Sequence, residues 1–239
     1  MVNKRDKLEK AFKAETDFKE YELDHLLMIG EFIGRNPVFF KKIYKAYKHN
    51  ETSAYFEPKR GAPITVTFDF KSKEVIINRQ KIEIKFMTKQ FLRFMELIDT
   101  YFSEIIPIGS VVSIDLDEIP ESLKLRMSNT NQDALMMIIS QNMVLRDHLT
   151  GFYADYLAVL WPFGAQERLT PLLVSNMMIK DVLHKGMTNE VEEEFKEKLK
   201  STTVSDNLRS VTYIEEEEVK KLQVKTDMVR KELGSGGES

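Results

Sequence analysis

The sequence predicts an α+β protein. We expect N-terminal helices with a small antiparallel β-meander, then a small curved β-sheet or partly open barrel with a following helix, and a charged helical tail. Apolar residues recur at helical spacing over residues 3–48, which is typical of amphipathic helices. Apolar and polar residues alternate over 64–87, as in antiparallel strands with one solvated face. Short apolar runs separated by turn residues fill 108–175 and precede an acidic segment.

The composition excludes several classes of function. The chain has 239 residues, enough to bury a core without disulfides, and it has no cysteine, which excludes thiolate chemistry. A net charge of −3 argues against a general nucleic-acid binder, which needs a basic excess. No segment approaches the roughly 20 apolar residues of a membrane-spanning helix, and the N-terminus lacks an apolar signal sequence. We therefore expect a cytoplasmic protein with no direct membrane insertion, which reaches a membrane only through a partner.

Three helices are expected before residue 50. The first spans residues 3–15. The second spans 21–34 and ends at Gly34, because glycine suits the backbone conformation that closes a helix. In the third, Asn36 is the expected cap and Pro37 the first helical residue.

The third helix has an aromatic face and a lysine face, which leaves two interpretations open. In the first, the aromatic residues pack in the core and the lysines face solvent. In the second, the helix is a basic, aromatic docking surface for an acidic partner. That interpretation requires Phe39 or Tyr47 to be exposed.

A β-meander and a long helix complete the first predicted module, residues 1–104. A loop is expected at 58–63, a strand at 64–70 and two short strands within 74–86. Thr88 is expected to cap the helix that follows. The predicted buried stripe of that helix consists of Phe91, Phe94, Met95, Ile98 and Phe102.

The second predicted module covers residues 105–200. Strands are expected at 111–116, 134–144, 152–164, the last of these three stopping at its Pro–Phe–Gly turn, and at 172–175. The near-continuous apolar run at 134–144 is typical of a central strand. Residues 176–185 are expected to form either a turn of helix or an extended edge of the sheet.

An acidic helix and a charged tail are expected at the end of the chain. Thr188 is the predicted cap of the acidic helix, and ion pairs are expected between Glu192 and Lys196 and between Glu194 and Lys198. Residues 201–239 are predicted to be a polar linker and a charged tail, with a helix whose apolar positions are sparse, among them Val219 and Leu222. So thin an apolar face suits either a solvated tail or a segment that docks on a partner.

No catalytic or ligand-binding motif is present in the sequence. The four histidines lack the spacing of a metal site. There is no P-loop, no dinucleotide-binding glycine pattern and no nucleophile elbow. We therefore predict no catalytic residue, no cofactor, no metal ligand and no enzyme activity. Paired methionines in the second module favour an adaptable, protein-binding surface.

Six short motifs follow one another in the second module. They are IGSVV at 108–112, LMMII at 135–139, YADY at 153–156, PFG at 162–164, VSNMMIKDVLHKG at 174–186 and EVEEEFKEKL at 190–199. In this order they resemble a family of uncharacterised Firmicutes domains encoded beside type VII secretion (Ess) genes and LXG toxins. The chain departs from the family pattern at Phe163, which replaces an acidic turn residue, and at Met177 and Met178, which replace polar residues. The link between the first two strands is also longer than in the family.

The resemblance implies a secretion chaperone or adaptor. Its expected partners are an LXG-type nuclease toxin, small helical WXG-like secretion partners and the membrane-embedded secretion ATPase. The candidate contact residues are Phe39, Tyr47, Phe163, Met177, Met178, Val219 and Leu222. Two alternatives stay open: an immunity protein that binds a toxin's catalytic domain, and an enzyme of unrecognised type.

Overall fold

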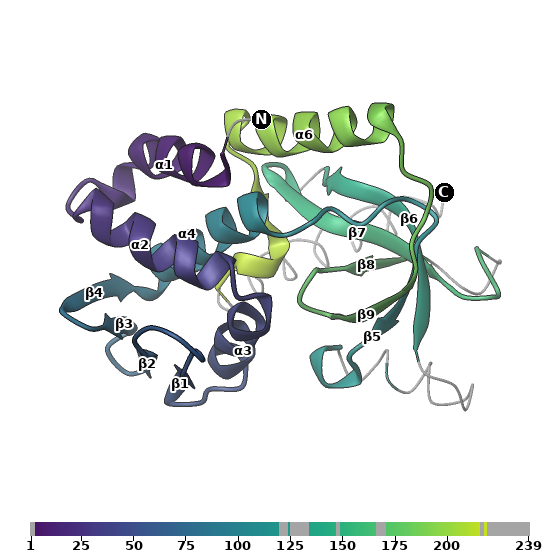
Figure 1. Cartoon of the computed structure of the whole chain (residues 1–239). Helices are drawn as coiled ribbons and strands as arrows, with labels where there is room; N and C mark the ends of the chain where they lie inside the picture. The colour runs from purple at the N-terminus through teal and green to yellow at the C-terminus, as the bar shows by residue number, and fades with distance from the viewer. Residues whose placement is uncertain are drawn as a thin grey trace, which may run out of the picture. The chain divides into compact units, whose positions relative to one another are not determined.

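The chain divides into two compact units. The computed structural model describes residues 3–119, 124, 134–146, 149–165, 171–215 and 218. The first unit is Met1–Ser103 and the second is Glu104–Ser239. Figure 1 shows the first in purple to blue and the second in teal to yellow. Within the described residues, no helix combines the length and the apolar character that crossing a membrane requires.

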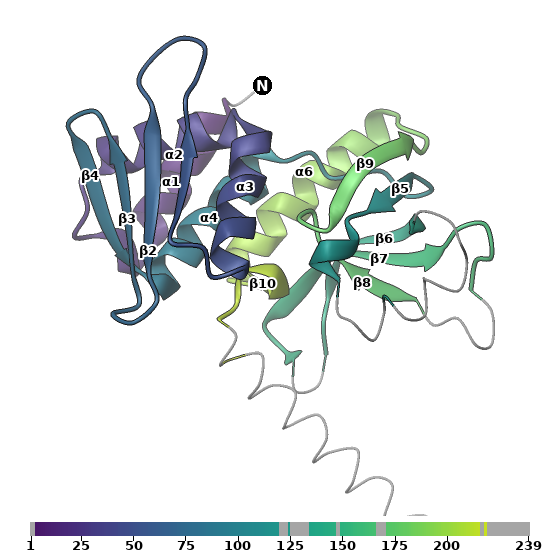
Figure 2. The ribbon, with the colours of Figure 1, turned by 90° about the horizontal axis from the view of Figure 1, so that it is seen from below.

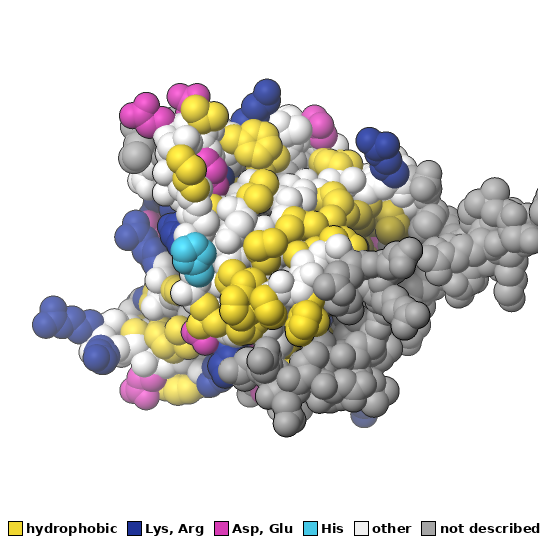
Figure 3. Space-filling view, turned by 90° about the vertical axis from the view of Figure 1, so that its right-hand side faces the viewer, with side chains coloured by type: hydrophobic (Ala, Val, Ile, Leu, Met, Phe, Trp, Pro, Cys, Tyr) yellow, Lys and Arg dark blue, Asp and Glu magenta, His cyan; other side chains and the backbone are white. Residues whose placement is uncertain are grey.

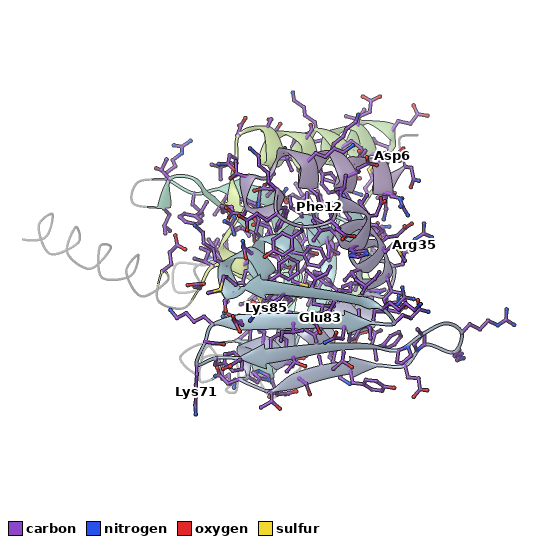
Figure 4. All side chains as sticks on the ribbon, turned by 90° about the vertical axis from the view of Figure 1, so that its left-hand side faces the viewer. Asp6, Phe12, Arg35, Lys71, Glu83 and Lys85 are labelled. Atoms are coloured by element: carbon purple, nitrogen blue, oxygen red, sulfur yellow. The ribbon has the colours of Figure 1, made fainter. Side chains whose placement is uncertain are left out.

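The first unit packs helices against one face of a four-stranded antiparallel meander, which has one strand more than the sequence predicts. Its helices are α1 (Lys4–Ala14), α2 (Leu23–Gly34), α3 (Pro37–Lys48) and α4 (Thr88–Phe102). Its strands, in spatial order, are β1 (Ser53–Phe56), β2 (Ile64–Asp69), β3 (Glu74–Arg79) and β4 (Ile82–Met87). Along β4 buried and exposed residues alternate, so Glu83 and Lys85 lie on the solvated face (Figure 4). Phe12 of α1 lies among the helices and is buried.

Helix α4 is buried on every side over residues 91–99, whereas the sequence predicts a one-sided stripe. It contacts α1, α2, β3 and β4, so even its charged residues are enclosed. Arg93 forms ion pairs with Glu15 at 2.5 Å and with Glu96 at 2.9 Å. Burial alone would lower the pKa of Arg93, but the two carboxylates outweigh it and raise that pKa. Contrary to the prediction, Phe102 is only partly buried.

Two local features of the first unit need the tertiary structure to explain them. Strand β1 is absent from the sequence prediction, because four residues carry too little alternation to reveal a strand. It forms by pairing with β2, with Ala54 opposite Val66. Gly34 lies so close to Phe102 that a Cβ atom would sit 2.4 Å from its ring. Close packing therefore requires glycine at this helix end.

The second unit is built on an open six-stranded sheet. Its strands are β5 (Val111–Ile114), β6 (Leu135–Val144), β7 (Phe152–Leu160), β8 (Leu172–Val174), β9 (Ile179–His184) and β10 (Arg209–Ser210). The spatial order is β10-β7-β6-β5-β9, and β8 also pairs with β7. Of the two predicted alternatives, a sheet or a partly open barrel, the structure has the sheet. The run at 134–144 is central, as predicted, because β6 lies between β5 and β7.

The end of the second unit differs in detail from the prediction. Residues 179–184 form an edge strand next to β5, which Figure 2 shows from below. Helix α6 (Glu190–Ser205) is capped by Asn189 rather than Thr188, because the Asn189 side chain accepts the Glu192 N–H at 2.9 Å. The chain from Ser201 is not a linker at first: α6 continues to Ser205, and β10 and the 3-10 turn η4 (Val211–Tyr213) follow. The helix predicted beyond Ile214 lies almost wholly outside the described residues.

Candidate functional site

The sheet of the second unit is apolar on both faces. Opposite residues of paired strands point to the same face, and successive residues point to opposite faces. Val112 lies opposite Met136, and Ile138 lies opposite Ala158. These four residues belong to the core of the unit. We call their side of the sheet the inner face. The residues between them must therefore lie on the other side.

The inner face is covered by the unit's own chain. Ile105 and Ile106, which precede β5, pack in the same core, as do Ile119 and Ile179. Leu199 of α6 is partly buried and packs against this core. Within the described part of the unit, the inner face is therefore largely covered.

Two side chains of the YADY motif in β7 form hydrogen bonds with three other segments of the chain. The Tyr156 hydroxyl donates to Asn176 Oδ1 at 2.8 Å and accepts the Ile106 N–H at 3.1 Å. The carboxylate of Asp155 accepts the Asn176 N–H at 2.9 Å. It also accepts the hydroxyls of Ser210 at 3.1 Å and Thr212 at 3.3 Å. These buried bonds give the motif a structural role.

Two other sequence motifs meet at the edge of the sheet. The Gly186 N–H donates to Ser110 Oγ at 2.9 Å. A Cβ atom on Gly186 would lie 2.1 Å from the carbonyl oxygen of Ile108. The IGSVV motif and the glycine before the acidic helix are therefore parts of one close backbone contact.

The opposite side, which we call the outer sheet face, is also apolar. Val111 lies opposite Met137, and Met137 lies opposite Val159. Leu157 lies opposite Leu173 on the same side. Leu173 is 42% exposed, Val111, Met137 and Leu157 are partly exposed, and Val159 is buried. None of these five belongs to the core cluster of the unit. Figure 3 shows hydrophobic side chains gathered in a band on one face of the molecular surface.

The predicted contact residues of the second unit and the tail differ in exposure. Phe163, in the turn after β7, is 46% exposed. Met178 is partly buried and packs against the core, so it offers little free surface. Val219 and Leu222 lie outside the described residues.

Two of the predicted contact residues are buried, and the prediction of exposure is wrong for both. Met177 is only 2% exposed. Phe39 has no exposed surface, because its ring stacks on Phe56 with centroids 5.0 Å apart. Tyr47 is half-buried against Phe68 and Phe70. Helix α3 therefore follows the first interpretation, with its aromatic residues in the core.

The outer face of α6 contains exposed apolar residues that the sequence analysis missed. Val191 is 72% exposed and Phe195 is 47% exposed. Their spacing of four residues, in a helix otherwise rich in glutamate and lysine, was the signal in the sequence. Instead, the buried side of the helix holds Lys196, which pairs with Glu192 at 2.6 Å and with Glu193 at 3.0 Å. Burial alone would lower the pKa of Lys196, but the two glutamates outweigh it and raise that pKa.

The described residues of the chain combine an apolar outer sheet face with buried charges that are paired. Among them, no group of three or more His, Asp or Glu side chains is placed to hold a metal ion. The buried charges of Arg93 and Lys196 are held in ion pairs. The arrangement can therefore take up apolar surface from another chain segment through the outer sheet face.

The fold and the site define the second unit as an α+β domain with an open sheet and an apolar outer face. A family model described as a domain of unknown function, DUF4176, matches residues 105–195. The chain thus contains a DUF4176 domain, which runs from the segment before β5 into the first turns of α6. Comparisons with curated proteins and with solved structures gave no match.

Proposed function

We propose that the protein is a cytoplasmic targeting chaperone, or adaptor, of a type VII secretion system. It binds an LXG-type nuclease toxin or its small helical WXG-like partners and delivers the toxin to the membrane-embedded secretion ATPase. In this proposal the chain is a counterpart of EsaE (also called EssE), the accessory factor of the staphylococcal Ess system. The proposal rests on the resemblance of the second module together with the additional N-terminal module and the chain length.

The observation that carries the proposal is the outer sheet face. Contiguous apolar surface on a folded domain marks an interaction site, because leaving it in water is unfavourable. Met137 lies near the middle of this face, and methionine adapts its shape to different partners. An amphipathic helix buries its apolar stripe on such a surface. The helical N-terminal part of a toxin therefore suits it.

Co-purification from a host that carries the secretion genes tests the proposal. The full chain should retain a toxin or a small helical partner. Leu173→Glu should abolish this retention, because a charge that is buried in an apolar interface loses its hydration. Val38→Glu is the matched control, since Val38 is 80% exposed on the first unit.

The part of the toxin that binds to the chain distinguishes a chaperone from an immunity protein. Binding of the helical N-terminal part supports the chaperone. Binding of only the C-terminal catalytic part would assign the chain to immunity proteins. Equal retention by the wild-type chain and the Leu173→Glu variant would refute the outer sheet face as the site.

A further inference from the structure

Trp161 extends the outer sheet face beyond the end of β7. Its backbone N–H donates to the carbonyl oxygen of Leu135 at 2.9 Å, which continues the pairing of β6 with β7 by one residue. Side chains two residues apart in a strand point to the same side of the sheet. The Trp161 side chain therefore lies on the same side as Val159, which is the outer sheet face. It is 43% exposed, so a partner can cover much of the indole ring.

The apolar residues of the outer sheet face follow a line along β7. Leu157, paired with Leu173 of β8, lies at one end of this line, and Trp161 lies at the other. Val159, which is paired with Met137, lies between them. Two residues that are four positions apart in a strand are separated by about 13 Å. An α-helix covers that distance in about nine residues, because it rises about 1.5 Å per residue.

Trp161 has the chemistry of an anchor in such an interface. Tryptophan is among the residues enriched at the few positions that contribute most of the binding free energy of protein complexes. Leu173 is exposed to almost the same fraction, 42%, but the indole ring is larger, so Trp161 offers more apolar area. Its ring also loses little conformational entropy on binding, and its indole N–H can donate a hydrogen bond to a partner.

We propose that a helix from the N-terminal part of the toxin lies along β7, with Trp161 as its main anchor at one end and the pair of Leu157 and Leu173 at the other. This inference rests on the proposed function and specifies how the outer sheet face binds its partner. The helix then needs an apolar stripe about nine residues long, with apolar side chains at positions i, i+4 and i+8.

Fluorine NMR on the otherwise unaltered full chain tests the anchor directly. Trp161 is the single tryptophan of the chain, so labelling with fluorotryptophan gives one resonance from this position alone. The unlabelled N-terminal part of the toxin contributes no signal. Its addition should shift the resonance saturably. An unchanged resonance in a complex that co-purification shows to have formed would overturn the inference and leave the proposed function standing.

Truncation of the anchor provides an independent readout. Trp161→Ala should weaken binding of the same toxin part by about 30-fold or more, as for other residues of this kind. Phe195→Ala is the matched control, because Phe195 is an aromatic residue that is 47% exposed on α6, the helix whose Leu199 packs on the inner face. Its affinity should stay within about twofold of the wild type. Urea titrations show whether both variants are folded.

Equal affinities of Trp161→Ala and the wild type would overturn the anchor. If Leu173→Glu still abolished binding in that case, the outer sheet face would remain the site. A wild-type chain that does not bind this toxin part would also overturn the inference, and co-purification decides separately on the proposed function.

Photo-crosslinking tests the direction of the helix. Benzoylphenylalanine in place of Trp161, and in a second protein in place of Leu173, keeps a large apolar side chain at each position. The two proteins should react with toxin residues about nine positions apart on one face of a helix. Reaction of both with the same toxin residue, or with two separate segments, would overturn the alignment along β7.

Discussion

Gly186 gives the sharpest prediction for the stability of the second unit. In Gly186→Ala, the new Cβ atom would lie 2.1 Å from the carbonyl oxygen of Ile108 and 3.0 Å from the amide nitrogen of Ser110. Because both neighbours are backbone, no side chain can turn away. The segments must separate by about 0.9 Å to reach even a 3.0 Å contact. That shift also weakens the bond from the Gly186 N–H to Ser110 Oγ.

The expected cost combines two terms. Overpacking against a fixed neighbour costs about 1–3 kcal/mol, and the weakened hydrogen bond about 1 kcal/mol. We therefore expect Gly186→Ala to lower the free energy of unfolding by about 2–4 kcal/mol in urea titrations. Hydrogen exchange should show faster exchange in β5 and β9, next to the contact. Ser110→Ala isolates the hydrogen bond and should cost only about 1 kcal/mol. The steric argument would be refuted if the free energy of unfolding of Gly186→Ala lay within about 0.5 kcal/mol of the wild-type value.

Two further predictions concern polar residues. Asp155→Ala should lower the free energy of unfolding of the second unit by about 2–3 kcal/mol, because it leaves the Asn176 N–H and two hydroxyls without their acceptor. In the same urea titration, Asp155→Asn should lower the free energy of unfolding by less than Asp155→Ala. An equal decrease in both variants would contradict the role of Asp155 as a hydrogen-bond acceptor. Hydrogen bonds from the backbone and side chain of Ser72 and from the Lys71 N–H lower the pKa of Asp69. Its stabilisation is therefore present above the ordinary pKa of an aspartate and is lost as pH falls through the lowered value. In Asp69→Asn the melting temperature should therefore fall less steeply with decreasing pH than in the wild type. The same pH dependence in both proteins would contradict the assignment.

The helices of the first unit were predictable because each carries a strong local signal. Pro37 at the start of α3 and Gly34 at the end of α2 mark boundaries that the structure retains to the residue. Strand β1 was not predictable, since its four residues are held by pairing with β2 rather than by their own pattern. The prediction of α4 was correct in type but wrong in burial, because its environment comes from four other elements.

The candidate site was predictable only in part. The apolar runs of β6 and β7 indicated strands, and that of β6 indicated a central one. They could not indicate that one face would be covered by Ile105, Ile106 and Leu199 and the other would stay outside the core. The prediction failed at Phe39 and Met177 for the same reason: exposure depends on what packs opposite a residue, and residues far away in the chain supply that.

The sequence by itself determined the types and the order of most elements, because hydrophobic period, caps and turn residues act within a few positions of one another. It also determined that a charged helix would follow the second set of strands. Only the tertiary structure decided that Lys196 would be buried while Val191 and Phe195 face solvent. It also decided which face of the second sheet is covered. Those outcomes depend on strand register and on packing between distant segments, which local patterns do not encode.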